Sequence, residues 1–258
     1  MSLFHDVQGQ GQPLVLLHGW AMHAGIFAPL VDRLADDFEL HLVDLPGHGR
    51  SAGAGVPLAL DAAVDAVLAK VPARSIWLGW SLGGLVALHA AAKHPGSVRG
   101  LAMLAASPRF VRGQDWPAGM DPAVFRGFGS ELGRDYRGTL DRFLMLEAQG
   151  SDHVREELRL LRPEVFAHGE PGADVLRDGL RLLEDTDLRE ALPGLAMPSL
   201  WLAGRRDRLV SPAAMQPAAA LAPASRFHEV RHGGHAPFLT HAGDVAAALR
   251  EFAGDCPP

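Results

Sequence analysis

The stretch from residue 76 to residue 85 constrains the fold of this chain more than any other. There an apolar run ends in Gly79-Trp80-Ser81-Leu82-Gly83, and an Ala-rich pattern with helical spacing follows. A strand that enters a helix through so tight a turn strains its central residue, and small flanking residues let the two backbones approach. The pattern therefore predicts a nucleophile elbow. Ser81 is its nucleophile, and the Leu82 N–H at the helix start is a donor to an oxyanion.

The length and composition indicate a globular protein with one large hydrophobic core. The chain has 258 residues, 48% of them hydrophobic, without an apolar stretch of membrane-spanning length. Residues 1–6 lack a signal-peptide pattern, so we expect a cytoplasmic protein, and the negative net charge gives no general attraction to an anionic membrane. Cys256 is the only cysteine, which excludes an internal disulfide, and we expect it in a frayed tail. The net charge of −6 gives no general attraction to nucleic acid.

Strand-like and helical segments alternate on both sides of the elbow. Continuous apolar runs, such as residues 14–17, suit strands that are buried on both faces of a parallel sheet. The alternation predicts an α/β fold, a mostly parallel, doubly wound sheet with helices on both faces. Candidate strands are residues 3–8, 14–17, 39–43, 75–78, 98–105, 198–203 and 226–230, and candidate helices are 24–35, 58–68, 82–93, 212–221 and 242–252.

The alternation stops between residues 109 and 190. This segment has many arginines and helical patterns but no convincing buried strand. We therefore expect a core of residues 1–108 and 191–258 with residues 109–190 inserted as a helical cap. Its candidate helices are residues 121–132, 138–149, 151–162 and 173–185.

A serine nucleophile needs a base within hydrogen-bond reach and an acid that orients the base. In folds with this elbow the order along the chain is Ser, then acid, then His. Asp207 follows the strand 198–203, and His235 follows the strand 226–230, so Ser81, Asp207 and His235 obey that order. His232 is the nearer rival for the base. We favour His235 because Pro237-Phe238 after it is a better anchor between loop and helix.

The loop after the first buried strand is His18-Gly19-Trp20. A loop at this strand end can face Ser81, so the Trp20 N–H is our candidate for the second oxyanion donor, while His18 is expected to shape the loop. The Gly-rich loop 44–51 lacks the spacing of a phosphate-binding loop. No His-Glu or Cys cluster suggests a metal, and we expect no metal and no cofactor.

These motifs resemble the α/β-hydrolases, and specifically the pimeloyl-acyl-carrier-protein methyl ester esterases of biotin synthesis. The resemblance spans nearly the whole chain. It is carried by residues 14–20, 41–51, 77–84, 115–117, 142–144 and 235–238. Trp80 is its most specific residue, because most α/β-hydrolases have another residue, often His, just before the nucleophile.

The resemblance implies a serine carboxylesterase that hydrolyses the methyl ester at the far end of a pimeloyl chain carried on acyl-carrier protein. No cofactor is implied, and we expect the chain to act as a monomer. Either an apolar slot for the acyl chain or an ordinary part of the core is expected from a set of aromatic and apolar side chains. These are Trp20, Trp80, Leu82, Phe143 and Met145.

The cap is expected to dock the acidic carrier protein. Arg155, Arg159 and Arg162 fall on one side of the predicted helix 151–162, and Arg142 lies on the helix before it. The alternative is a solvated helix face with ordinary intrahelical ion pairs. The family's arginine four residues before Arg142 is Gly138 here, which weakens the match.

Two other functions fit the same sequence. One is a promiscuous short-chain esterase, lactonase or carbon-carbon hydrolase, which a panel of nitrophenyl esters would separate from a carrier-dependent esterase. The other is a hydrolase-fold protein that senses a small ligand without turnover, since a fold alone does not define a function. The complete set of Ser81, Asp207 and His235 favours an enzyme.

Overall fold

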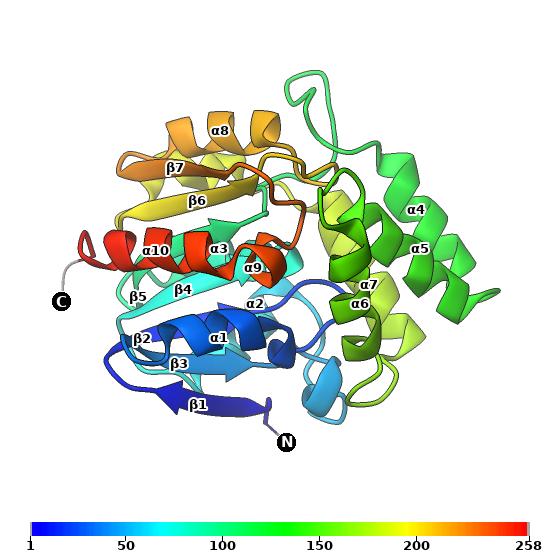
Figure 1. Ribbon diagram of the computed structural model, residues 1–258, viewed down its shortest axis with the longest axis horizontal. Helices are drawn as coiled ribbons and strands as arrows, with labels where there is room; N and C mark the ends of the chain where they lie inside the picture. The colour runs from blue at the N-terminus through cyan, green and yellow to red at the C-terminus, as the bar shows by residue number, and fades with distance from the viewer. Residues whose placement is uncertain (1, 257–258) are drawn as a thin grey trace.

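Seven strands form one sheet in the computed structural model, which describes residues 2–256 (Figure 1). Their order is β1-β3-β2-β4-β5-β6-β7, with β1 antiparallel to β3 and every other neighbouring pair parallel. The mostly parallel sheet confirms the predicted fold class. The strands are β1 (His5–Gly9), β2 (Gln12–Leu17), β3 (Phe38–Val43), β4 (Ser75–Trp80), β5 (Val98–Leu104), β6 (Ser199–Gly204) and β7 (Ser225–Val230).

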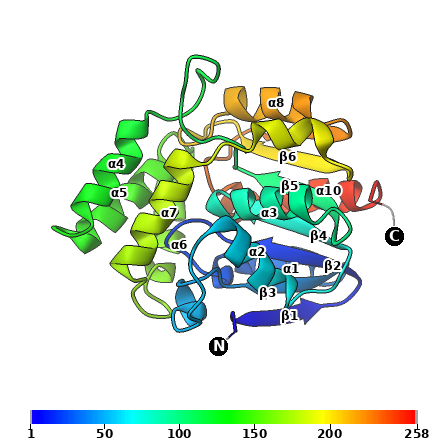
Figure 2. The same cartoon turned by 180° about the vertical axis from the view of Figure 1, so that it is seen from behind.

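Helices cover both faces of the sheet. On one face α1 (Ala28–Leu34) packs against α10 (Ala242–Ala253) and the short α9 (Pro237–Thr240) (Figure 1). On the other face lie α2 (Leu60–Leu68) and α3 (Leu82–Lys93), with α8 (Pro212–Leu221) beyond them (Figure 2). Three short 3-10 helices complete these layers: η1 (Ala24–Phe27), η2 (Gly49–Ser51) and η3 (Arg189–Gly194).

The central strands have continuous apolar runs because both of their faces are covered. Every residue of β4, β5 and β6 is buried, whereas the edge strands β1 and β7 are largely exposed. In the register of β2 with β4, Leu17 lies beside Gly79. The loops that follow these two strands therefore leave the sheet next to each other.

Four further helices lie between β5 and β6 in the chain: α4 (Pro122–Glu131), α5 (Tyr136–Ala148), α6 (Val154–Glu164) and α7 (Ala173–Asp185). They gather at the end of the sheet where the parallel strands finish (Figures 1 and 2). We call residues 109–190 the cap. That this segment is a unit inserted into a core of residues 1–108 and 191–258 stays a prediction.

The end of the described chain differs from expectation. Cys256 does not lie in a frayed tail, because it is buried and its thiol is 3.5 Å from the carbonyl oxygen of Phe252. A side chain built on Gly100 would come within 2.4 Å of its sulfur, so the glycine makes room for the thiol. Across residues 2–256, no helix has the length and apolar character needed to cross a membrane.

The elbow brings α3 into very close contact with the strands. A Cβ atom built on Gly79 would lie 2.2 Å from the carbonyl oxygen of Gly83. One built on Gly83 would lie 2.3 Å from that of Leu17 in β2. Neither gap admits a methyl group, and the neighbours are backbone atoms that cannot rotate away. The glycines therefore allow the tight strand-to-helix turn.

We predict that Gly83→Ala lowers the free energy of unfolding by roughly 1–3 kcal/mol or more, the usual cost of overpacking a well-packed core. Gly127→Ala is the matched control, since Gly127 also lies in a helix but no atom lies within 4 Å of an added Cβ. Alanine is the better helix former there, so stability should hold or rise by up to about 1 kcal/mol. Urea unfolding measures both, and equal effects would contradict the packing argument.

Candidate active site

Ser81 lies at the turn between β4 and α3, in a conformation that few residues adopt. Its φ of 53° and ψ of −119° lie in a region that is strained for a side chain with a Cβ. Its N–H donates to the carbonyl of Leu104 in the neighbouring strand, at 3.1 Å. The hydroxyl oxygen is buried and has no hydrogen-bond partner among residues 2–256. The turn thus holds a polar atom free at the end of the sheet.

Asp207 and His235 meet beyond the ends of β6 and β7. Nδ1 of His235 is 2.8 Å from Oδ2 of Asp207, and both side chains are buried. The other oxygen, Oδ1, accepts hydrogen bonds from the backbone N–H groups of Leu209 and Val210 at 2.8 and 2.9 Å. Because a carboxylate accepts at Nδ1, that nitrogen carries the hydrogen. Nε2 is then an acceptor in the neutral imidazole.

The charges around His235 favour its protonated form. Burial lowers the pKa of the imidazole, but the charge of Asp207 and its hydrogen bond raise it more, and the result is a pKa above the usual 6.5. The buried carboxyls of Glu147 and Glu157 in the cap act in the same direction. A group with such a pKa can take and return a proton near neutral pH.

No hydrogen bond joins the Ser81 hydroxyl to the His235 ring. Ser81 Oγ and His235 Nε2 are both buried, and neither has a partner in the described part of the chain. Such contacts are often long in a free enzyme and tighten when substrate binds. Trp80 joins the elbow to the loop that carries His235, because its indole N–H donates to the carbonyl of His235 at 2.8 Å. Trp80 therefore positions the histidine loop against the elbow.

His232 and His18, the other two histidines considered, have surroundings that differ from those of His235. His232 is 57% exposed, and its Nδ1 is 3.0 Å from Asp152 Oδ2 in the cap. His18 is buried, with Nδ1 2.8 Å from the carbonyl of Gly19 and Nε2 accepting from the N–H of Leu45 at 2.9 Å. Burial lowers the pKa of His18 to about 3, so its ring stays neutral. Both ring nitrogens of His18 are occupied, which fits the role of shaping its loop.

The loop after β2 lies against the elbow. A Cβ on Gly19 would lie 3.1 Å from the Trp80 ring and 3.2 Å from the Cβ of Ser81. The backbone N–H groups of Trp20 and Leu82 donate to no group within residues 2–256. One of these donors follows Gly19 and the other follows Ser81 directly; that they form an oxyanion hole stays a prediction.

The expected acyl slot is only partly brought together. Trp20 and Phe143 pack with ring centroids 4.4 Å apart, and the Trp20 indole N–H donates to the Leu176 carbonyl of α7 at 2.8 Å. Trp80 packs instead against Phe238 and His235, on the side of the histidine loop. Met145 is 44% exposed, on the outer side of α5. It therefore lies away from the buried aromatic group.

The sequence reasoning missed Glu147. This residue of α5 is fully buried, and its Oε1 lies 4.0 Å from His235 Nε2. Burial, the largest effect, raises its pKa to about 8; the charge of His235 opposes this shift, and the charges of Asp207 and Glu157 add to it. The helical period provides a signal, since residues four apart lie on one face and Phe143 was expected to face the site.

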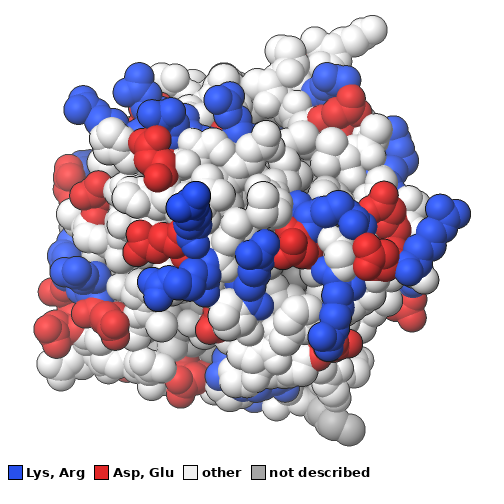
Figure 3. Space-filling view, turned by 45° about the vertical axis from the view of Figure 1, so that its right-hand side comes forward, with Lys and Arg blue, Asp and Glu red and all other residues white. Residues whose placement is uncertain are grey.

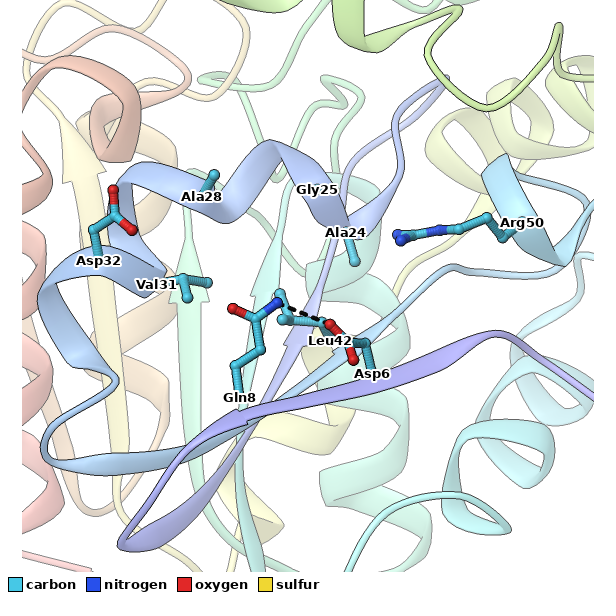
Figure 4. Close-up of a pocket in the computed structure, with 9 residues that line it drawn as sticks. All are labelled: Asp6, Gln8, Ala24, Gly25, Ala28, Val31, Asp32, Leu42 and Arg50. Atoms are coloured by element: carbon cyan, nitrogen blue, oxygen red, sulfur yellow. Dashed lines mark hydrogen bonds between the residues drawn. The ribbon is translucent and has the colours of Figure 1, made fainter.

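A separate cavity lies between β1, α1 and η2 (Figure 4). Its volume is about 120 Å³, and its polar lining includes Asp6, Gln8, Asp32 and Arg50. Ser81, Asp207 and His235 are not among its lining residues. Within residues 2–256, no group of three or more His, Cys, Asp or Glu side chains is arranged to hold a metal ion.

The fold is that of an α/β-hydrolase. A family profile described as alpha/beta hydrolase fold matches residues 12–242. Among solved structures, an esterase from Exiguobacterium antarcticum superposes with a TM-score of 0.86 at 22% identity, covering 98% of this chain and 95% of that one. A bromoperoxidase from Bacillus anthracis reaches 0.88 at 23% identity, with the same coverage of both chains. At such identity these structures show the fold alone.

Curated relatives identify a particular family among the α/β-hydrolases. The pimeloyl-acyl-carrier-protein methyl ester esterase of Stenotrophomonas maltophilia is 61% identical over 253 residues, covering 98% of this chain and 97% of that protein. The enzyme of the same name from Xanthomonas campestris is 60% identical over 252 residues, covering 98% and 99%. The chain belongs to the α/β-hydrolase-fold family and, within it, to the family of pimeloyl-acyl-carrier-protein methyl ester esterases. The resemblance drawn from the sequence is confirmed.

We predict that Ser81→Ala and His235→Ala each lower ester turnover by several orders of magnitude, as losses within a catalytic triad do. His232→Ala, the control, should keep turnover within a few-fold, because its imidazole is bonded to Asp152 at the surface. Steady-state hydrolysis of a nitrophenyl ester measures all three. An equal collapse in the folded His232 variant would overturn the assignment of the base.

Proposed function

We propose that the protein is a serine carboxylesterase that hydrolyses the methyl ester of a pimeloyl chain carried on acyl-carrier protein, a step of biotin synthesis. The contact that carries the proposal is the buried hydrogen bond between His235 and Asp207, set beside the strained Ser81. The names of relatives that are about 60% identical over nearly the whole chain support the substrate. Growth of a biotin-requiring strain that lacks this esterase, restored by the gene for this chain, tests the pathway.

In the proposed reaction Ser81 Oγ attacks the ester carbonyl while His235 Nε2 takes the hydroxyl proton. Asp207 holds the imidazole in the required tautomer and stabilises its charged form. The backbone N–H groups of Leu82 and Trp20 stabilise the oxyanion. His235 then gives its proton to the departing methoxide, which leaves as methanol, and a water molecule releases the acid from Ser81.

The acyl chain is proposed to lie between the core and the cap. Trp20, Leu82 and Phe143 are fully buried, and the contact of the Trp20 and Phe143 rings supports an apolar slot. Trp80 packs against His235 and Phe238, so we propose that it borders the slot on the side of the histidine loop. Met145 is not part of the proposed slot because its side chain is exposed. Since Ser81 is also fully buried, the ester reaches it only when the side chains that cover it move.

We propose that the outer face of the cap docks the carrier protein. Arg155 and Arg159 are exposed on α6, one turn apart. Arg142 is nearby in sequence on α5 but is bonded to Glu131 and Asp135, with distances of 2.6 and 3.1 Å. Acidic and basic side chains are interspersed on the face shown in Figure 3. Docking therefore depends most on Arg155 and Arg159, and Arg142 must exchange partners to take part.

The assembly and location follow from the same proposal. Ser81, Asp207 and His235 all come from one chain, so we propose that a monomer is active. Because the proposed substrate is attached to acyl-carrier protein, we also propose that the enzyme acts in the cytoplasm with this partner. The proposed chemistry uses neither a membrane nor nucleic acid, and it needs no metal or cofactor.

We predict that kcat/KM falls on the acid side as His235 becomes protonated, since only the neutral imidazole accepts the Ser81 proton. The neighbouring Asp207 charge raises the pKa of His235 above 6.5, so the decline begins at a higher pH than an ordinary histidine would give. A profile with a free methyl ester measures it. Activity should be unchanged by a chelator, and strong inhibition by chelation would contradict a serine mechanism.

We predict that Arg155→Glu together with Arg159→Glu selectively slows hydrolysis of the carrier-bound ester. Opposite charges speed association of protein partners, and high salt weakens this effect. The loss should be at least about tenfold at low salt and smaller at high salt. A small free ester should be hydrolysed at the wild-type rate. Arg33→Glu on α1 is the control for charge reversal, and equal rates on both substrates in the double variant would refute docking.

A further inference from the structure

The carboxyl of Glu147 is an unexplained polar group at the centre of the site. It is completely buried, and neither of its oxygens has a hydrogen-bond partner among residues 2–256. Buried polar groups are nearly always hydrogen-bonded, because leaving one unpaired costs free energy. Protonation of Glu147 reduces this cost but leaves its oxygens without partners. A ligand or reactant that bonds to the carboxyl would explain its position.

The distance between the Glu147 carboxyl and the His235 ring indicates which reactant fits between them. Glu147 Oε1 lies 4.0 Å from Nε2, the ring nitrogen that faces away from Asp207. An oxygen atom at a hydrogen-bond distance of about 2.8 Å from both would make an angle of roughly 90° between them. A water molecule can donate one hydrogen to each acceptor in that position. Its lone pairs then remain free to attack a carbonyl carbon.

We propose that Glu147 is a catalytic residue that holds the hydrolytic water beside His235 during release of the acyl group. This inference rests on the proposed serine esterase function. Once methanol has left, the water oxygen bonds to the acyl carbon while one of its protons passes to His235 Nε2. The bond between that carbon and Ser81 Oγ then breaks, and Oγ takes the proton from His235. The products are the carboxylic acid and free Ser81.

No neighbouring carboxyl can replace Glu147 in this role. Both oxygens of Asp207 accept hydrogen bonds, from His235 and from two backbone N–H groups. Glu157 in α6 accepts from Ser151 at 2.6 Å, and among described residues only Asp207 and Glu147 have carboxyl oxygens within 4.0 Å of the His235 ring nitrogens. Glu147 offers an acceptor oxygen in either protonation state, since a neutral carboxyl keeps its carbonyl oxygen.

The test separates the two halves of the reaction. Hydrolysis of p-nitrophenyl acetate in a stopped-flow instrument gives a burst, which reports acylation of Ser81, and a steady state, which reports release. Glu147→Leu, which has no acceptor, should slow release by about 10- to 100-fold, the scale of a misplaced reactant. Its burst rate should change by less than about threefold. The acyl-enzyme should accumulate on Ser81 in mass spectra, and hydroxylamine should restore turnover by attacking it.

Two variants serve as controls. Glu147→Gln keeps a carbonyl oxygen as acceptor, so its release rate should stay within about fivefold of wild type. Glu157→Gln changes another buried cap carboxyl and should leave the ratio of release to acylation unchanged. Burst amplitude counts the folded sites in each variant. Glu147→Met is the second apolar variant if the leucine protein does not fold, and buried charges are often replaced by apolar residues without loss of the fold.

Equal slowing of both steps in the apolar variants, or unchanged release, would overturn the role of Glu147. So would a Glu157→Gln variant with the same selective loss of release. These outcomes differ from failure of the proposed function. If wild-type protein hydrolysed no ester and formed no adduct on Ser81, the serine esterase itself would be wrong.

Discussion

The close approach of α3 to β2 and β4 is the constraint on which the site depends. Only glycine fits at Gly79 and Gly83, where an added side chain would collide with backbone carbonyls. Between these glycines Ser81 has a positive φ, and its hydroxyl oxygen has no hydrogen-bond partner among residues 2–256. Strain of this kind persists only where surrounding packing holds it. Here the fully buried strand β4 on one side and the helix on the other provide that packing.

A cluster of buried ionisable groups is the second feature of the molecule. Asp207 satisfies both oxygens with hydrogen bonds, so its charge is tolerated in the interior. The charge of Asp207 raises the pKa of His235, whereas burial raises the pKa of Glu147 to about 8 although the charge of His235 opposes that rise. Burying charges costs free energy unless they are paired. The free-energy cost of burying these groups is therefore concentrated at the proposed reaction site.

Tryptophan residues connect the parts of the site rather than only filling it. Trp80 joins the elbow to the loop of His235, and Trp20 joins the loop after β2 to α7 of the cap. Each uses its ring for packing and its indole N–H for one buried hydrogen bond, the combination that suits this side chain. The position of α7 is therefore coupled to the loop that carries the Trp20 N–H.

The sequence by itself determined the fold class and the three residues proposed for catalysis, because strand and helix periods, glycine spacing and chain order are local signals. It did not determine the surroundings of those residues. The buried state of Glu147, the exposure of Met145 and the pairing of Arg142 with Glu131 and Asp135 depend on how the helices of the cap lie on the core and on one another. Such contacts join residues far apart in the chain, and no local pattern encodes their distances. Tertiary packing decided them.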